Sequence, residues 1–529
     1  MTDPPDPSRT SAGTVFLVGA GPGDAGLLTV RGQQLLRQAG AILFDALVNP
    51  RLLDVAPAEA ERLDVGKRAG NHKLSQDKIH QLLYEKVQQH RIVVRLKGGD
   101  PYLFGRGAEE VAYLAERGVP CIVVPGVPAG IAAPACAGIP VTYRGVASSV
   151  TFITGHEEPG RESSGLEAAA LSRLIGVGGT VCFYMGVGRL PGIVAALLAE
   201  GTDKQMPSAA VQWGTLPTQR SVQAPLERIV EACKVAEIGA PAIIIIGRAA
   251  GVEAPGLDFF TSRPLFGRSI LVTRTRQQAS QLRERLEQLG AAVLEAPTIE
   301  LAPPADWAPV DRTIRDIRNY DWLVLTSPNG VAALADRLAA LDLDARHLAG
   351  VQIAAVGDAT ATALEERLCL RADLLPGRAV AESLAAEVLA RQDVAGKRFL
   401  LLRADIARPD LPRLLEEAGA TVDDLPIYHT RPAESLPETV LDALRRGEID
   451  WVTFTSSSTA TNLVGLLGAD DLGHLRRVKR ASIGPVTSRT LNDLDLPATV
   501  ESGTTGGLEG LIAAIVDHET QPPYNEQRC

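Results

Sequence analysis

The second half of this 529-residue chain contains an internal repeat, which strongly constrains its fold. Residues 267–274 match residues 396–403, which begin 129 positions later (396 against 267). The period is far too long for a solenoid repeat. We therefore predict two related α/β lobes with a ligand cleft between them, the alternative being a duplication kept only for packing. Three further pairs match in the same order: 289–291 with 418–420, 321–327 with 450–456, and 356–360 with 483–487.

The composition limits the class of protein. The chain is too long for one ordinary domain, and an apolar content of 45% lets two domains each bury a core. A net charge of −10 argues against nucleic acid as a partner, so local Arg and Lys must bind any acidic ligand. Six scattered cysteines without a Cys-x-x-Cys pair predict no metal site and a cytoplasmic location. Apolar runs such as 242–246 are strand-length, so no membrane span is expected.

Strand-like runs alternate with helical patterns along the whole chain, which predicts an α/β fold class. Residues 1–12 are rich in Pro, Ser and Asp and are expected to be disordered. We expect a first domain at 13–250. Residues 251–266, rich in Gly and Pro and without periodicity, are the expected linker. A second domain is expected at 267–518, followed by a C-terminal tail at 519–529.

Two Gly-rich turns follow predicted strands. Residues 93–107 run from an apolar strand into Gly-Gly-Asp-Pro, flanked by three cations, which suits close approach of the backbone to a ligand. Residues 19–24 resemble a dinucleotide fingerprint, but Asp24 stands where Gly is needed and would repel a pyrophosphate. With Asp24 and Asp100, the two turns suit a nucleoside that carries a cationic group. The alternatives are a dinucleotide site and two purely structural turns.

These turns and seven further motifs resemble the uroporphyrinogen-III C-methyltransferases of the tetrapyrrole methylase family, over about residues 13–258. The resemblance implies two α/β subdomains with S-adenosylmethionine in the cleft between them. It also implies methylation of C2 and C7 of uroporphyrinogen III to give precorrin-2. The motifs, in order, are 19–24, 44–48, 65–70, 93–107, 138–142, 154–156, 184–186, 212–215 and 241–243.

The resemblance also implies roles for single residues. Asp45 corresponds to the base, which would take a proton from the macrocycle if burial raises its pKa. Lys67 corresponds to the acid; alternatively Lys67 or Arg68 only binds substrate carboxylates. The family usually has Thr at the position of Pro128, and proline offers neither a hydroxyl nor an N–H. The implied cofactor-binding residues are Pro22, Gly98, Gly99, Asp100, Leu103, Pro128, Ala129, Met185 and Gly214.

The implied substrate carries many carboxylates, and four arginines on motif loops are the expected anion clamps: Arg68, Arg95, Arg106 and Arg144. For Arg95 and Arg106 the alternative is a role in the local fold. His156 lies in a Gly turn, and we expect it to stabilise that turn.

Residues 267–518 resemble uroporphyrinogen-III synthase at 325–327, 356–360, 425–430, 455–458 and 483–487. The resemblance implies one lobe of about 267–300 plus 431–518, another of 301–430, and a swapped connection. It implies closure of hydroxymethylbilane to uroporphyrinogen III, with ring D inverted and water lost. Tyr428 corresponds to a tyrosine that helps the hydroxyl leave; alternatively it caps the lobe junction. Hydroxyls at strand ends suit carboxylate binding, so the expected substrate residues are Thr326, Ser327, Thr360, Thr455, Ser456 and Thr487.

Arg274 and Arg403 end equivalent strands of the repeat. One of them is expected to bind ligand, and the other is expected to be its structural equivalent without a role in binding. The two halves together predict a bifunctional enzyme of sirohaem or cobalamin biosynthesis, because the product of the second half is the substrate of the first. The alternatives are a methylase of a later corrin intermediate joined to the synthase, and a non-catalytic tetrapyrrole-binding carrier. The methylase family is usually dimeric, which implies a homodimer through the first domain.

Overall fold

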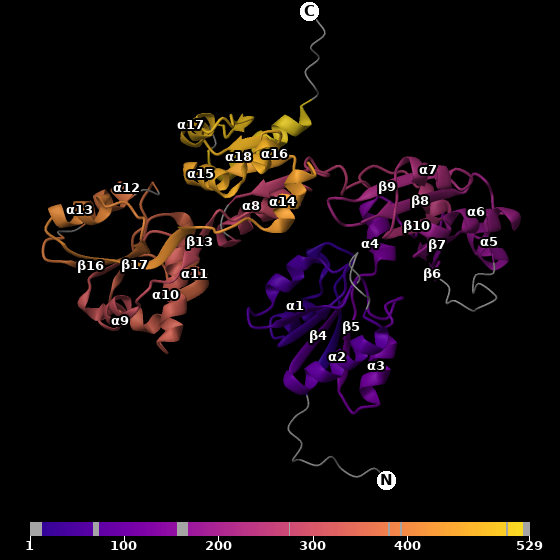
Figure 1. The fold of residues 1–529 in the computed structure, drawn as a ribbon, viewed down its shortest axis with the longest axis horizontal. Coiled ribbons are helices and arrows are strands. Elements are labelled where there is room, and N and C mark those ends of the chain that lie inside the picture. The colour runs from indigo at the N-terminus through magenta and orange to yellow at the C-terminus, as the bar shows by residue number, and fades with distance from the viewer. Residues whose placement is uncertain are drawn as a thin grey trace, which may run out of the picture. The chain divides into compact units, whose positions relative to one another are not determined.

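The computed structural model describes residues 13–66, 74–155, 168–273, 276–378, 381–391, 394–503 and 506–521. Residue contacts divide the chain into two compact units. Unit 1 comprises residues 1–268 with 287–292, and unit 2 comprises 269–286 with 293–529. Each unit contains two five-stranded sheets with helices between the strands, so the predicted α/β class is confirmed (Figure 1). Among the described residues, no helix has both the length and the apolar character needed to cross a membrane.

The first sheet of unit 1 is entirely parallel, in the order β3-β2-β4-β1-β5. Because β1 and β4 are neighbours, the two Gly-rich turns that follow them lie at the same edge of the sheet. The elements are β1 (Thr14–Gly19), η1 (Ala25–Leu27), α1 (Val30–Leu36), β2 (Ala41–Phe44), η2 (Pro50–Val55), β3 (Glu61–Asp64), α2 (Gln76–Gln89), β4 (Ile92–Lys97), α3 (Gly107–Ala115) and β5 (Cys121–Val124).

The second sheet of unit 1 is mixed, in the order β6-β7-β10-β8-β9, with only β6 and β7 parallel to each other. The apolar run predicted as a strand at 242–246 is its buried central strand. The elements are α4 (Ala129–Cys136), β6 (Ser149–Thr154), α5 (Ala168–Gly176), β7 (Gly179–Tyr184), η3 (Val187–Arg189), α6 (Leu190–Ala199), β8 (Pro207–Gln212), β9 (Arg220–Pro225), α7 (Ile229–Val235), β10 (Ala242–Ile246) and η4 (Arg248–Gly251).

The segment predicted as a linker, 251–266, contains no helix or strand after Gly251. It is nevertheless packed against unit 1. Phe260 and Leu265 are buried, and the backbone of Leu257 and Asp258 lies close to Gly138. The segment predicted as a linker is therefore partly buried.

One sheet of unit 2 has the order β12-β11-β18-β19-β20, and the other has the order β13-β17-β16-β14-β15. The first is built from both ends of the unit: β11 (Ser269–Val272), α8 (Arg276–Gln288), β12 (Ala292–Glu295), α14 (Glu438–Arg445), β18 (Trp451–Phe454), α15 (Ser457–Leu466), α16 (Ala469–Leu475), β19 (Lys479–Ser482), α17 (Pro485–Asp493), β20 (Val500–Glu501) and α18 (Gly507–Thr520). The second is continuous: β13 (Ile299–Ala302), α9 (Ala308–Arg315), η5 (Ile317–Asn319), β14 (Trp322–Leu325), α10 (Pro328–Ala340), η6 (Ala345–Leu348), β15 (Gln352–Ala355), α11 (Asp358–Leu368), α12 (Ala381–Arg391), β16 (Arg398–Ala404), α13 (Asp410–Glu417) and β17 (Thr421–Pro432).

The sequence repeat is a structural repeat. Strands β12, β11, β18 and β19 of one sheet occupy the same order as β17, β16, β14 and β15 of the other. In both sheets, a matched Asp joins neighbouring strands by a hydrogen bond. Asp321 accepts from the Arg398 N–H at 2.9 Å, and Asp450 accepts from the Ser269 N–H at 2.7 Å. Part of the repeat is therefore explained by strand register.

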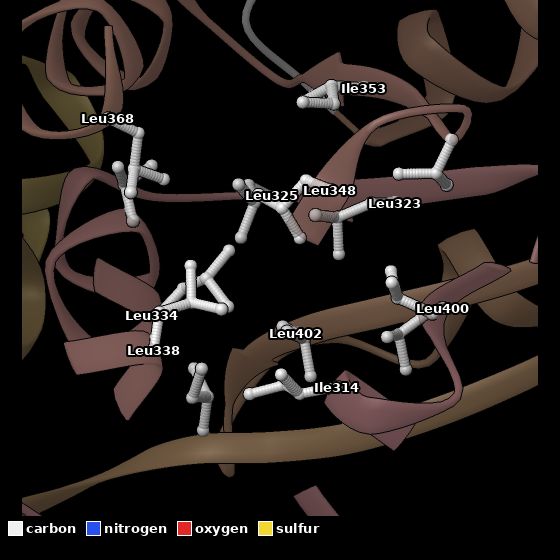
Figure 2. Close-up of a cluster of buried hydrophobic side chains, with 14 of the residues drawn as sticks. Ile314, Leu323, Leu325, Leu334, Leu338, Leu348, Ile353, Leu368, Leu400 and Leu402 are labelled. Carbon is white, nitrogen blue, oxygen red and sulfur yellow. The ribbon is translucent and has the colours of Figure 1, made fainter. Parts of the chain in front are cut away.

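The core of the continuous lobe shows how its strands are buried on both faces. In Figure 2, Leu323 and Leu325 of β14 lie on one face with Leu400 and Leu402 of β16. Alternate residues point to opposite faces, so the residues between them pack on the other side, against α12 and α13. Parallel strands buried in this way need continuous apolar runs, as the sequence of both strands has.

Three glycines let the loops after β1, β4 and β5 touch backbone to backbone. A Cβ on Gly126 would lie 2.2 Å from the Gly99 carbonyl oxygen, and one on Gly19 would lie 2.5 Å from the Gly126 Cα. Gly21 and Gly99 both have positive φ, and each donates its N–H to the carbonyl of the other, at 3.3 and 2.7 Å. No larger residue can enter this contact without moving backbone.

Gly126→Ala is expected to destabilise unit 1 by roughly 1–3 kcal/mol, because the added methyl group meets backbone that cannot move aside. Hydrogen exchange at the amides of β1 and β4 measures the loss. Gly192→Ala is the matched control, since a Cβ there meets nothing within 4 Å. Equal protection in both variants would contradict the prediction.

Candidate functional site

A cavity of about 420 Å³ lies between the two subdomains of unit 1. Its walls come from the loops after β1, β4 and β5, the start of α4, and the loops after β7 and β8. The volume is in the usual range for a small-molecule site. All nine residues predicted to bind the cofactor line this cavity: Pro22, Gly98, Gly99, Asp100, Leu103, Pro128, Ala129, Met185 and Gly214.

Asp100 organises the cavity floor. Its Oδ1 accepts from the N–H groups of Tyr102 and Leu103, at 2.8 and 3.2 Å, and its Oδ2 accepts from the Gly126 N–H at 3.0 Å. The carboxylate therefore holds its own turn and ties it to the loop after β5. Asp24 caps η1 through the Gly26 N–H and does not line the cavity. Of the two acids that we predicted would face a ligand, only Asp100 lies at the cavity.

Strained residues gather around this cavity. Phe104, Met185 and Trp213 have φ of 55°, 53° and 49°, a region that side chains other than glycine rarely adopt, and all three line the cavity while partly exposed. Each such residue costs of order 1–3 kcal/mol, and they concentrate at functional sites. Neither Phe104 nor Trp213 was predicted as a site residue. The sequence signal that could have identified them is an aromatic residue inside a Gly-rich motif loop.

Tyr184 stabilises the start of α4, where Pro128 has no side chain to cap the helix. The Gly130 N–H donates to the Tyr184 hydroxyl at 2.6 Å, which supplies the missing cap from another strand. The Tyr184 ring also contacts Phe104, at 5.0 Å between centroids. Burial raises the pKa of Tyr184 to about 12, and the Gly130 hydrogen bond partly opposes that rise.

Asp45 is only partly buried and forms an ion pair. Its side chain is 32% exposed, and its Oδ1 lies 2.5 Å from Nη2 of Arg95. Arg95 is only 2% exposed and also pairs with Glu110, so its guanidinium is not available as a substrate clamp and serves the fold. Asp45 follows β2, and Leu47, two residues further on, lines the cavity.

The other predicted clamps differ in position. Arg106 is exposed at the start of α3 and pairs with Glu109 at 2.6 Å, and Arg144 is exposed on a loop. Lys67, Arg68 and His156 lie outside the described residues.

Unit 2 contains a second cavity, of about 290 Å³, between α10 and the paired strands β13 and β17. Tyr428 and Asn329 line it, and Trp307 closes one side. The Tyr428 hydroxyl lies 2.9 Å from the Ser327 Oγ. Burial raises the pKa of Tyr428, which keeps the phenol protonated. The tyrosine therefore offers a proton donor at the cavity wall.

The predicted hydroxyl residues of unit 2 occupy matched places in the two lobes. Ser327 and Ser456 cap α10 and α15, so both hydroxyls have structural partners. Thr326 and Thr455 follow β14 and β18 and are half-buried, whereas Thr360 and Thr487 are buried in the first turns of α11 and α17. Carboxylate binding by these six residues stays a prediction.

Arg403 is buried and pairs with Asp424, through Nε to Oδ1 at 2.6 Å, and with the Arg408 carbonyl. It is the structural member of the predicted arginine pair, and Arg274 lies outside the described residues. Within the described ranges, no group of His, Cys, Asp or Glu is arranged to hold a metal ion.

Comparisons with known proteins divide the chain in the same way. The family Tetrapyrrole (Corrin/Porphyrin) Methylases matches residues 14–230, and Uroporphyrinogen-III synthase HemD matches residues 280–513. The porphyrin biosynthesis protein HemD of Ruminiclostridium josui is 37% identical over 96% of this chain and 98% of that protein. The uroporphyrinogen-III C-methyltransferase of Synechocystis sp. is 45% identical over 44% of this chain and 88% of that protein. A third relative is the S-adenosyl-L-methionine-dependent uroporphyrinogen III methyltransferase of Methanosarcina barkeri. It is 42% identical over 47% of this chain and 98% of that protein.

Tyr184→Phe is expected to lower the free energy of unfolding of unit 1 by about 1 kcal/mol, because the cap of α4 is lost while the ring contacts remain. The phenol has a higher pKa in the folded state, about 12 against 10, so its contribution is complete below pH 10 and is lost as the pH rises through about 12. Denaturation of both proteins across this range tests the prediction. A difference between them that does not change above pH 10 would contradict it.

Proposed function

The chain belongs to the tetrapyrrole methylases in its first unit and to the uroporphyrinogen-III synthases in its second, and on that premise we propose a two-step reaction sequence. Unit 2 closes hydroxymethylbilane to uroporphyrinogen III with ring D inverted. Unit 1 then methylates that product at C2 and C7 with S-adenosylmethionine to give precorrin-2. A homodimer through unit 1 and a cytoplasmic location complete the proposal.

The charge of the unit 1 cavity carries the methylation part of the proposal. Among the described residues that line it, Asp100 is the only charged one, and no Lys or Arg is present. A dinucleotide or other phosphate ligand is usually bound by cations, which the described lining lacks, and the N-terminus of α4 that borders the cavity already donates its Gly130 N–H to Tyr184. A nucleoside that carries a sulfonium needs neither, and it fits Gly-rich backbone, apolar walls and one carboxylate.

The residues would share the binding as follows. The turn at 98–100 and the first residues of α4 present backbone to the nucleoside, while Pro22, Leu103 and Met185 supply apolar contact. When bound, S-adenosylmethionine supplies an electrophilic methyl group. The chain's contribution is to position the pyrrole carbon against it, and positioning of two reactants is worth up to roughly 7–11 kcal/mol.

A proton must leave the macrocycle after each methyl transfer. We assign its acceptance to Asp45, beside the cavity on the loop that contains Leu47. Lys67 is the proposed acid, and Arg68, Arg106 and Arg144 are the proposed carboxylate clamps. A positioned acid or base contributes about 10²–10⁴-fold to a rate.

The synthase step needs little from side chains beyond shaping the bilane. Tyr428 lines the cavity, its hydroxyl lies 2.9 Å from Ser327 Oγ, and burial raises its pKa, so the phenol is protonated. We assign it the proton given to the departing hydroxyl. Hydroxyls at the strand ends of both lobes bind carboxylates without buried charge.

An assay with hydroxymethylbilane, with and without S-adenosylmethionine, tests both steps. We expect uroporphyrinogen III without the methyl donor and a dimethylated product with it, identified by mass and by isomer separation. Uroporphyrinogen I alone would contradict the synthase step. Uroporphyrinogen III that is never methylated would contradict the methylase step and favour a methylase of a later corrin intermediate. Binding of tetrapyrroles without turnover would favour a carrier.

Tyr428→Phe is expected to slow formation of uroporphyrinogen III about tenfold, the effect of losing one hydrogen bond of ordinary strength to the leaving group. Tyr320→Phe is the matched control in the same lobe, because its hydroxyl bonds Asp423 and does not line the cavity. Methylation of supplied uroporphyrinogen III should be unchanged in both variants. Equal loss in both, or none in Tyr428→Phe, would contradict the role of Tyr428.

A further inference from the structure

Beside the unit 1 cavity lies a buried group of charges that the proposed reaction does not use. Arg95, Lys97 and Glu110 have side chains that are 2%, 4% and 0% exposed. Arg95 and Lys97 are two apart on β4 and therefore project to one face, where α3 places Glu110. Oppositely charged groups buried here carry a high desolvation cost.

Glu110 anchors the group through a single oxygen. Its Oε1 accepts from Lys97 Nζ at 2.9 Å, from Gln76 Nε2 at 3.1 Å and from Arg95 Nε at 3.4 Å. Its Oε2 is buried without a hydrogen-bond partner among the described residues. An acid so incompletely satisfied is poorly explained by stability alone, because a polar network that is only partly satisfied is worse than an apolar core.

Arg95 connects this buried anchor to the half-buried Asp45. Its Nη2 lies 2.5 Å from Asp45 Oδ1, while Nη1 donates to the carbonyls of Leu43 and Leu96 at 3.4 and 3.3 Å. The guanidinium is thus fixed from β2, β4 and α3 at once. The carboxylate at its far end belongs to the residue that we assign as proton acceptor.

We propose that Arg95, held by Glu110, is a positioning residue for methylation and acts only through Asp45. This inference rests on the proposed function. Because Arg95 binds Oδ1, Oδ2 is the oxygen that accepts the proton. As the new carbon–carbon bond forms, the methyl–sulfur bond of S-adenosylmethionine breaks and S-adenosylhomocysteine leaves. The methylated carbon is fully substituted and carries no hydrogen, so the macrocycle loses one proton from another position for each methyl group, and that proton passes to Oδ2. Lys97 shares the Glu110 oxygen and directly precedes Gly98, so the proton acceptor and the cofactor turn have one anchor.

A double-mutant cycle tests whether Arg95 works through Asp45. Asp45→Asn should lower kcat for methylation of uroporphyrinogen III about 100-fold. Arg95→Met should lower kcat at least tenfold, with KM for the tetrapyrrole and Kd for S-adenosylhomocysteine unchanged within about twofold. The double variant should be no slower than Asp45→Asn alone. Losses that multiply, or a change confined to KM or Kd, would overturn the proposal.

Two further variants separate positioning from folding. Glu110→Gln keeps the shape of the anchor and removes its charge, so kcat should fall in the native protein and should not fall further when Asp45→Asn is added. Arg117→Met is the matched control, an exposed arginine just after α3, and should behave as wild type. Thermal unfolding identifies any variant that does not fold. Wild-type rates in folded Glu110→Gln would count against the anchor.

The result is separable from the proposed function itself. If the wild-type protein does not methylate uroporphyrinogen III with S-adenosylmethionine, the proposed function is wrong. If the wild type is active and Asp45→Asn is equally active, Arg95 has nothing to act through; this inference and the assignment of Asp45 as proton acceptor are then wrong, while the proposed methylation itself stands.

Discussion

The backbone pairing of Gly21 with Gly99 is the contact on which the unit 1 site depends. It joins the turns after two neighbouring parallel strands, and the Asp100 carboxylate adds the loop after β5 through Gly126. Loops at the carboxyl ends of neighbouring parallel strands lie close together in any such sheet, but side chains normally separate their backbones. Glycine at 19 and 126 removes those side chains, and Gly99 supplies the positive φ of its turn, so three loops form one floor. The strain at Phe104 then lies on a rigid support rather than on a free loop.

The sequence predicted the features that depend on local chemistry. Positive φ favours glycine, so the Gly-rich turns were visible in the sequence, whereas the nine predicted cofactor residues were implied by the family resemblance and meet at one cavity. Partners in space were not visible. The burial of Arg95 and Glu110 depends on α3 covering β4, and the antiparallel pairing of β10 with β7 and β8 cannot be read from the order of strands and helices. The buried Phe260 is likewise hidden by the composition of its segment.

The repeat in unit 2 helps to distinguish residues with a structural role from residues with a functional one. The matched residues Asp321 and Asp450 hold neighbouring strands together, and Ser327 and Ser456 cap helices, so each of these matches has a structural role. Tyr428 breaks the symmetry. The residue 129 positions earlier is Ile299, on β13, which pairs with the end of β17 close to Tyr428. The repeat therefore places no second tyrosine at the position matched to Tyr428, and both Ile299 and Tyr428 lie in the sheet that borders the cavity.

The buried charges also explain how a motif with three cations can border a site for a cationic ligand. At an effective dielectric constant near 20, a unit charge about 8 Å away would cost a sulfonium about 2 kcal/mol. Glu110 counters Lys97 and, with Asp45, counters Arg95, so this group carries no net charge. Asp100 then sets the sign of the field in the cavity. The contact between the Asp45 carboxylate and the Arg95 guanidinium, which orients Asp45, therefore also removes the repulsion between Arg95 and a cationic cofactor. A cationic cofactor and an anionic substrate can both bind because the charged groups of the protein lie at different depths.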